Sequence, residues 1–490
     1  MQNTTKRGSS ASLTGLVREH YRYFLSVTVA AVALRLLFIL KFPELTPDSL
    51  LYADLARNWL QHGIFGMTDD NGIVATSIRL PGYPAFLAVH FAIFGVDRYG
   101  SVRLVQLILD VATCFVVADT ARRVASGRAA RIAFLLAALC PSTANYVAVA
   151  LTETPTILLT ALAFAFAVAA LQRMEAEGNA ASGLWAGAGA AIGVAILMRP
   201  DSGLLLIVIG GYLLVQLLRR RGFRGEFFKA GVVLSLVSLV PLLPWTARNW
   251  IDFHRFDPLP SVTAATPGEF VAYGFFKWES TWVADYSSVE DIGFHVDGQP
   301  IRVQDLPARA FDNADERRRV EGLFNAYSEN GNAISPEIDA GFAALARERI
   351  ARKPLRQYLW LPALRVLSMW LRPRTEQLPV DSHWWRFAED RHDAVIASLL
   401  GLANLLFLLP AWWTTVRMLW GRSQRLHLPY AGMFLAYPIA RTLLLAGLSN
   451  PEPRYVLECY PVLFVIGAVG LASIGRHEKP HLAVSTEGLG

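Results

Sequence analysis

The stretch FLSVTVAAVALRLLFIL at residues 24–40 is an apolar run with Arg35 as its one charged residue, and TPDSLLY follows at residues 46–52. A run of about 17 apolar residues is long enough to cross a bilayer as a helix. Because it lacks a small-residue cleavage site, we expect a retained span rather than a signal peptide. Asp48 therefore stands at the mouth of the first span, where an amphipathic, helix-like stretch begins and continues to Gln61.

The composition of the whole chain indicates a membrane protein. Of 490 residues, 53% are hydrophobic and 18% are charged, which leaves too little polar surface for a soluble protein of this size. The net charge of +6 would also suit nucleic-acid binding. Most basic residues, however, lie in short loops between apolar runs, where they orient a membrane protein, so we expect no nucleic-acid partner.

About ten segments of the chain are predicted to span the membrane. Their approximate ranges are 24–41, 102–121, 129–147, 152–171, 184–198, 201–218, 229–249, 394–416, 428–447 and 455–474. Three loops between them are strongly basic, which places these loops in the cytoplasm. These loops contain Arg122 to Arg131, Arg219 to Lys229, and Arg417 to Arg425.

The basic loops fix the rest of the topology. With them inside, the Asp48 loop lies outside, and the apolar segments 81–95 and 356–372 do not cross but form interfacial or re-entrant outer helices. The expected fold class is an all-α polytopic membrane protein with about ten spans and a modest extracytoplasmic domain. The expected parts are a cytoplasmic tail 1–23, a transmembrane core 24–249 with the first outer loop 42–101, an extracytoplasmic domain with an interfacial helix at 250–393, transmembrane helices 394–474 and a cytoplasmic tail 475–490.

Residues suited to chemistry gather at the outer ends of the predicted spans. The candidates are Asp48, Arg79, Glu153, Arg199, Asp201, Arg248, Glu452, Arg454 and Tyr455. Arginine binds phosphate oxygens with two parallel hydrogen bonds, and a carboxylate can take the proton of an attacking hydroxyl. This distribution favours chemistry between a lipid-phosphate sugar donor and an acceptor at the outer surface. In that chemistry Asp48 would act as base, with Arg248 and Arg454 as a phosphate clamp.

The order of several short motifs resembles a known class of enzyme. These are the first-loop acid, RLPGYP at 79–84, TETP at 152–155, Arg199-Pro200 and Pro453-Arg454-Tyr455. Together they resemble the GT-C membrane glycosyltransferases, in particular the bacterial branch related to protein O-mannosyltransferases and the lipid A aminoarabinose transferase. The resemblance covers most of the chain outside residues 250–393.

The resemblance implies a hexosyl- or pentosyltransferase that uses a polyprenyl-phosphate-linked sugar, with Asp48 as catalytic base. The acceptor would be a glycan, a lipid or a protein, and the enzyme would lie in the bacterial inner membrane with its active site facing the periplasm. A single base on the acceptor side favours inversion. Many relatives have two adjacent acids in this loop, whereas Pro47 and Ser49 flank Asp48 here. We therefore predict neither a metal nor another cofactor.

Each candidate also has a structural alternative. Asp48 fits a helix N-cap, and Glu153 fits a helix start before Pro155. Arg199 and Asp201 can pair with each other. Arg79, Arg248 and Arg454 can be interfacial anchors.

Two charges lie within predicted spans. Arg35 is near enough to the outer end to reach water, whereas Asp110 has no evident partner in the sequence. Asp54, on the stretch that begins at Asp48, is expected to be a solvated helix residue.

Two other classes of function remain open at this stage. A transporter or flippase would need polar or broken spans near the bilayer centre and would typically contain repeats, whereas the charges here gather at one face. A non-catalytic assembly protein of envelope polysaccharide synthesis would keep the fold without needing Asp48.

Overall fold

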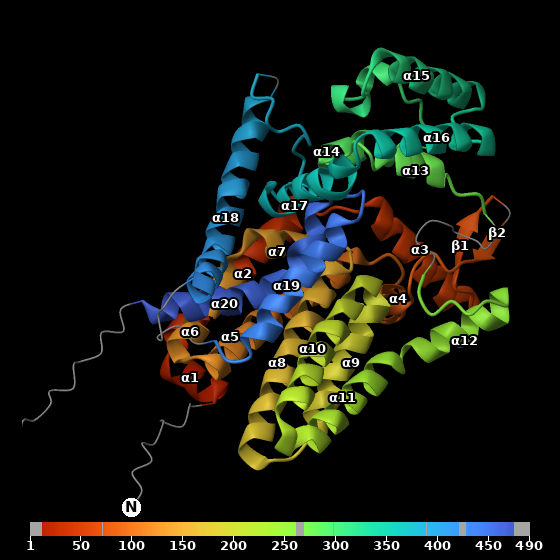
Figure 1. Cartoon of the computed structure of the whole chain (residues 1–490). Helices are drawn as coiled ribbons and strands as arrows, with labels where there is room; N and C mark the ends of the chain where they lie inside the picture. Colours follow the sequence, from red (N-terminus) through yellow and green to blue (C-terminus); the bar gives the residue numbers. More distant parts are fainter. Residues whose placement is uncertain are drawn as a thin grey trace, which may run out of the picture.

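The computed structural model describes residues 12–70, 72–260, 269–296, 298–388, 390–420 and 428–474. Long helices pack side by side in a bundle, α18 lies along one side of it, and helices α13 to α17 gather at one end (Figure 1). The expected all-α polytopic class is confirmed, with a small two-stranded sheet as an addition. The predicted tail 475–490, residues 1–11 of the predicted tail 1–23, and the loop residues Arg422 and Arg425 lie outside the described residues.

The bundle contains most of the apolar helices, and α1 within the predicted N-terminal tail packs against it through Leu16. Its elements are α1 (Leu13–Glu19), α2 (Tyr21–Lys41), α5 (Tyr99–Val124), α6 (Gly127–Leu139), α7 (Pro141–Asn145), η1 (Tyr146–Ala148), α8 (Glu153–Glu177), α9 (Ser182–Met198), η2 (Pro200–Ser202), α10 (Gly203–Arg219), η3 (Arg221–Phe223), α11 (Arg224–Leu239), α12 (Leu242–Phe253), α18 (Arg391–Trp420), α19 (Ala431–Ala446), η8 (Pro453–Cys459) and α20 (Tyr460–Ser473).

Six helices of the described chain are long and apolar enough to cross a membrane, or up to eight if each of two bent pairs is one span. The bent pairs are α6 with α7 and η1, and α11 with α12. The remaining two predicted spans correspond to α9 and α19, which have 17 and 16 residues and are shorter than a typical span. The count of ten spans therefore stays a prediction.

The predicted first outer loop combines two helices with a hairpin. These are α3 (Pro47–His62), the antiparallel strands β1 (Gly66–Asp69) and β2 (Gly72–Ala75), and α4 (Gly82–Phe94). Asp54 accepts hydrogen bonds from the backbone and hydroxyl of Thr68 at 2.7 and 3.0 Å. The expectation that Asp54 is merely solvated is wrong, because it holds the hairpin to α3.

Residues 272–346 form a second apolar core of their own, within the predicted extracytoplasmic segment. Phe275, Trp278, Phe324 and Phe342 pack there with ring centroids 5.0 to 6.4 Å apart. The elements of this part and of the connection that follows it are α13 (Tyr273–Glu279), α14 (Tyr286–Ser288), η4 (Val289–Gly293), η5 (Val303–Asp305), η6 (Ala308–Ala310), α15 (Ala314–Glu329), α16 (Pro336–Arg352), η7 (Arg356–Trp360) and α17 (Leu361–Leu371).

Arg35 and Asp110 are partners inside the bundle. Arg35 is 0% exposed and donates from Nε to Oδ2 of Asp110 at 2.6 Å. Its other nitrogens donate to carbonyls of Ala137 and Ala138, near the end of α6, where Pro141 opens the next helix and carries no N–H to continue the ladder. Asp110 thus has a partner, and the expectation that Arg35 reaches water is wrong. The pair stabilises the bend between α6 and α7.

Candidate active site

Asp48 lies in the first turn of α3, and the N-terminal cap of this helix does not use its side chain. Thr46 is the N-cap: its hydroxyl accepts from the Ser49 backbone at 3.2 Å, and the Ser49 hydroxyl accepts from the Thr46 backbone at 3.3 Å. This reciprocal pair satisfies the helix start. The alternative that Asp48 serves as the N-cap is therefore wrong.

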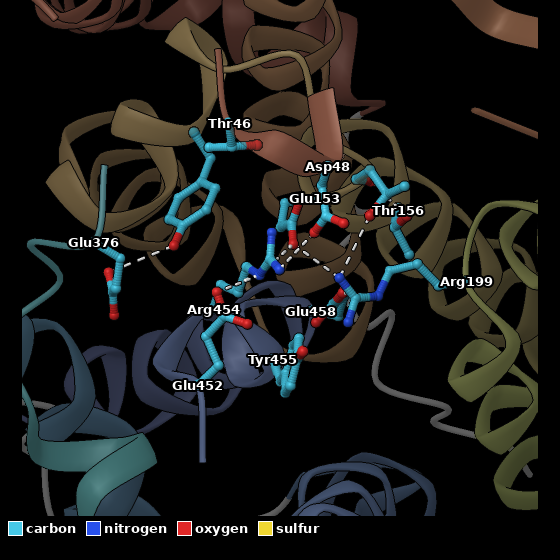
Figure 2. Close-up of polar contacts among 12 residues, drawn as sticks. Thr46, Asp48, Glu153, Thr156, Arg199, Glu376, Glu452, Arg454, Tyr455 and Glu458 are labelled. Atoms are coloured by element: carbon cyan, nitrogen blue, oxygen red, sulfur yellow. Dashed lines mark hydrogen bonds and ion pairs between the residues drawn. The ribbon is translucent and has the colours of Figure 1, made fainter. Parts of the chain in front are cut away.

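Two arginines hold the Asp48 carboxylate. Nη2 of Arg79 lies 3.0 Å from Oδ1. Nη2 of Arg454 lies 2.9 Å from Oδ2 (Figure 2). Burial opposes ionisation of this carboxyl, but the charges of Arg454 and Arg79 outweigh burial and hold the pKa of Asp48 below its usual range. Asp48 is consequently ionised at neutral pH, and it is a weak base while both arginines remain on it.

Arg454 is shared by three carboxylates from separate parts of the chain. Besides Asp48, its Nε lies 2.7 Å from Glu452 and 3.6 Å from Glu153 at the start of α8. Figure 2 shows the three acids arranged around this guanidinium. The predicted residues of the first loop, the α8 start and the last outer turn therefore meet at one point.

Arg199 extends this cluster on the other side of Glu153. Its Nη1 lies 2.8 Å from Glu153, and its Nε lies 3.2 Å from Glu458 and 3.3 Å from Asp201. The predicted pairing of Arg199 with Asp201 is present, as one contact within a larger network. Nη2 of Arg441, from α19, then binds Asp201 and Glu458 at 2.7 Å each.

Tyr455 joins the two halves of the cluster without an ion pair. The Cζ atom of Arg199 lies 5.2 Å from the centre of its ring, and that of Arg454 lies 5.6 Å from it. Both guanidinium groups thus stack near one aromatic ring, an arrangement that stabilises cations at a partly desolvated site.

Arg248 lies at a different place from Arg454. It donates to the carbonyls of Phe65 and Thr76 beside the hairpin at 2.8 and 2.9 Å, and pairs with Asp252 at 2.7 Å. All of its described contacts go to the hairpin region and its own helix. The geometry therefore does not bring Arg248 and Arg454 together as the predicted clamp.

Sequence reasoning missed several members of this cluster. Arg441 and Glu458 lie in apolar helical runs and are 0% exposed, so the rule that flags charges inside spans would have found them. Glu376, from the segment after α17, accepts a hydrogen bond from the Tyr146 hydroxyl at 3.5 Å. It lies in the one large region that resembled nothing known, and no sequence signal pointed to it.

Two acids in this region have pKa values above the usual range of a carboxyl group. Burial raises the pKa of Glu452 to about 7, since the charge of Arg454 opposes this only in part and Asp48, Glu153 and Glu376 add to it. Burial likewise raises the pKa of Glu376, against the charge of Arg374. Within the described ranges, no group of three or more His, Cys, Asp or Glu side chains is placed to share a metal ion.

Part of this chain matches a known protein family, and its fold is similar to that of solved membrane proteins. The family model of dolichyl-phosphate-mannose-protein mannosyltransferases matches residues 79–245. No curated protein sequence gives a significant match. The oligosaccharyltransferase AglB from Archaeoglobus fulgidus, solved with an inhibitory peptide and a dolichol-phosphate, has a TM-score of 0.51 and 15% identity over 93% of this chain and 50% of that one.

The chain thus spans about half the length of AglB. ArnT from Cupriavidus metallidurans, solved with undecaprenyl phosphate, has a TM-score of 0.38 and 15% identity over 92% of this chain and 77% of that one. The chain is thus a polytopic membrane protein whose residues 79–245 match the dolichyl-phosphate-mannose-protein mannosyltransferase family and whose fold is similar to that of AglB.

Proposed function

We propose that this protein is a glycosyltransferase that moves a sugar from a polyprenyl-phosphate donor to an acceptor hydroxyl, with inversion and with Asp48 as general base. The reaction would take place at the periplasmic face of a bacterial inner membrane. The observation that carries the proposal is the Asp48 carboxylate, 28% exposed and held between Arg79 and Arg454 at the start of α3. The family match and the lipid phosphates bound by AglB and ArnT support the class of donor.

The bond changes are those of a single displacement. The acceptor oxygen attacks the anomeric carbon, the bond from that carbon to the phosphate oxygen breaks, and the electron pair leaves with the polyprenyl phosphate. Asp48 takes the proton of the acceptor hydroxyl. The phosphate changes from a diester with one negative charge to a monoester, which carries more negative charge, so a cation beside it stabilises the transition state more than the ground state.

Arg454 links donor binding to the strength of the base. When the donor phosphate binds Arg454, it competes with Asp48 for that guanidinium. Loss of one of its two cationic partners raises the pKa of Asp48, because the ionised form is then less stabilised. Asp48 would become an effective base only with donor in place, which also limits wasteful activation of water.

The test is sugar transfer by purified protein from a panel of polyprenyl-phosphate sugars, comparing wild type with Asp48→Asn. The variant keeps the shape of the side chain and removes the base, so we expect kcat to fall by about 100-fold or more while the donor still binds. Asp97→Asn is the matched control, because Asp97 is also in the first outer loop but pairs with Arg57 away from the cluster.

The outcomes separate the classes of function. Transfer that is lost in Asp48→Asn and kept in Asp97→Asn supports the enzyme and its base. Transfer that survives in Asp48→Asn removes Asp48 from the role of base. Absence of transfer from every donor in wild type would contradict the glycosyltransferase and favour an assembly protein or a transporter.

A further inference from the structure

We propose that Glu376, Glu452, Tyr146 and Tyr286 form a second subsite beside Arg454, which binds the hydroxyl groups of a carbohydrate ring. The inference rests on the proposed glycosyltransferase function and deepens it, since it assigns residues to recognition of the sugar. All four residues lie outside the short motifs that carry the family resemblance.

The segment 372–377 brings the region after α17 into the site. Arg374 within it is 2% exposed and donates to the Met369 carbonyl at 2.7 Å. It also lies 3.5 Å from the hydroxyl of Tyr460, the first residue of α20. Arg372, 8% exposed, lies over the Tyr286 ring at 5.5 Å and donates to Ser287 at 2.9 Å. The segment therefore contacts the bundle through Arg374 and contacts α14 through Arg372.

The four residues surround the same charges. Glu376 accepts from the Tyr146 hydroxyl, and both residues are within electrostatic range of Glu452 and Arg454. Tyr286 reaches the same segment through Arg372, whose guanidinium lies 5.5 Å from the centre of the Tyr286 ring. In Figure 2, Glu376 and Glu452 lie on the side of Arg454 away from Arg199. The subsite is thus next to Asp48 but apart from the Arg199 network.

Polar atoms at this location have no partner within the described protein. Glu452 is 3% exposed, and its Oε1 binds Arg454 while its Oε2 has no hydrogen bond. Oε1 of Glu376 is also without one, as are both side-chain polar atoms of Asn145, which is 2% exposed and precedes Tyr146. Buried polar groups without partners are costly and rare in native proteins, so a ligand that hydrogen-bonds to them gains affinity.

The chemistry of these groups selects a neutral polyol. Two carboxyl groups accept hydrogen bonds from hydroxyls, and two phenols can donate as well as accept. A second phosphate would be repelled by the two acids. The carbohydrate ring could belong to the sugar that is transferred or to a carbohydrate acceptor.

The test compares Glu376→Gln and Tyr146→Phe with wild type, using donors and acceptors that each lack one hydroxyl. We expect kcat/KM for the complete substrates to fall by about 10- to 100-fold, the effect of losing a hydrogen bond to a charged group. The decisive readout is the penalty for the missing hydroxyl. With wild type, kcat/KM for one deoxy compound should be much lower than for the complete substrate. In the variant, most of this difference should disappear.

A reduced penalty with a deoxy donor assigns the subsite to the transferred sugar, and one with a deoxy acceptor assigns it to the acceptor. Penalties that are unchanged for all compounds would overturn the proposal. Glu348→Gln is the matched control, because Glu348 lies on the outer domain in an exposed pair with Arg319.

Binding measurements keep this test separate from that of the proposed function. Polyprenyl phosphate without sugar should bind wild type and Glu376→Gln equally, whereas the sugar-bearing donor or the carbohydrate acceptor should bind the variant more weakly. The subsite would be overturned if Glu376→Gln weakened binding of polyprenyl phosphate without sugar and left binding of the sugar-bearing compounds unchanged. If wild type transfers no sugar, the proposed function fails, and binding of the carbohydrate compounds still decides the subsite.

Discussion

Replacement of Arg454 by Gln removes the cation that three carboxylates share. Asp48 keeps Arg79 at 3.0 Å, and Glu153 keeps Arg199 at 2.8 Å. Glu452 would lose its cation, because Arg454 is its one ion-pair partner among the described residues. Breaking a buried pair by removing one partner costs about 3–5 kcal/mol. The lower end applies below about pH 7, where Glu452 can take up a proton.

The loss of stability should grow as pH rises. A buried acid with a raised pKa is stabilising in its protonated form, and that contribution disappears as pH rises through its folded pKa. Without Arg454 the pKa of Glu452 rises further, so the variant should weaken above neutral pH. Tryptophan fluorescence of the detergent-solubilised protein, which has 13 Trp, can follow thermal unfolding. At about 2 °C per kcal/mol, the apparent Tm should fall by roughly 6–10 °C.

The double variant Arg454→Gln/Glu452→Gln separates folding from function. It removes the unpaired acid together with the cation, so most of the lost Tm should return. Sugar transfer should stay about 100-fold or more below wild type, the usual effect of deleting a group that stabilises transition-state charge. Arg173→Gln, in an exposed pair with Glu177, serves as the control. A single variant as stable as wild type from about pH 6 to 9, or a double variant with full activity, would refute the reasoning.

Two further predictions concern the Arg35–Asp110 pair inside the bundle and Glu452 in the cluster. Asp110→Asn leaves the Arg35 guanidinium buried without a countercharge and should destabilise the protein by about 3–5 kcal/mol. The double variant Asp110→Asn/Arg35→Met should lose less stability. Thermal unfolding of both variants checks this, and equal losses would contradict the pairing. Ionised Glu452, whose pKa is about 7, competes with the donor phosphate for Arg454, so wild-type kcat/KM should fall as pH rises through 7. Glu452→Gln should lose that descending limb, and superimposable pH profiles would argue against it.

Hydropathy predicted the polytopic helical fold, because burial in lipid demands long apolar segments. The orientation inferred from the basic loops stays a prediction. Local patterns were less decisive at helix starts. Thr46 and Asp48 both fit an N-cap, and the reciprocal hydrogen bonds of Thr46 with Ser49 decide between them. Hydropathy also gives no count of spans where helices are short or bent, as α9 and α19 are.

The contacts within the candidate site could not be predicted, although most of its residues could. Asp48 and Arg454 are 406 positions apart in the chain, and their contact depends on the tertiary packing that brings the start of η8 near the start of α3. Arg35 and Asp110 were each recognised as intramembrane charges but not as a pair, because their contact depends on the bend after α6. No sequence signal pointed to Glu376, because its contact with Tyr146 depends on how the segment after α17 packs against the bundle.

The balance of charge in the cluster has a consequence for how a donor binds. The carboxylates outnumber the arginines there: Asp48, Glu153, Asp201, Glu452 and Glu458 face Arg79, Arg199, Arg441 and Arg454. Each of these arginines already binds at least one acid, so a phosphate that binds here would gain a cation only where a carboxylate is displaced or takes up a proton from solvent. Of the four arginines, Arg454 is the best suited to bind the phosphate. Its partner Glu452 can take up a proton from solvent near pH 7, and its partner Asp48 can turn to the acceptor. Donor binding and release of the base would then be one event.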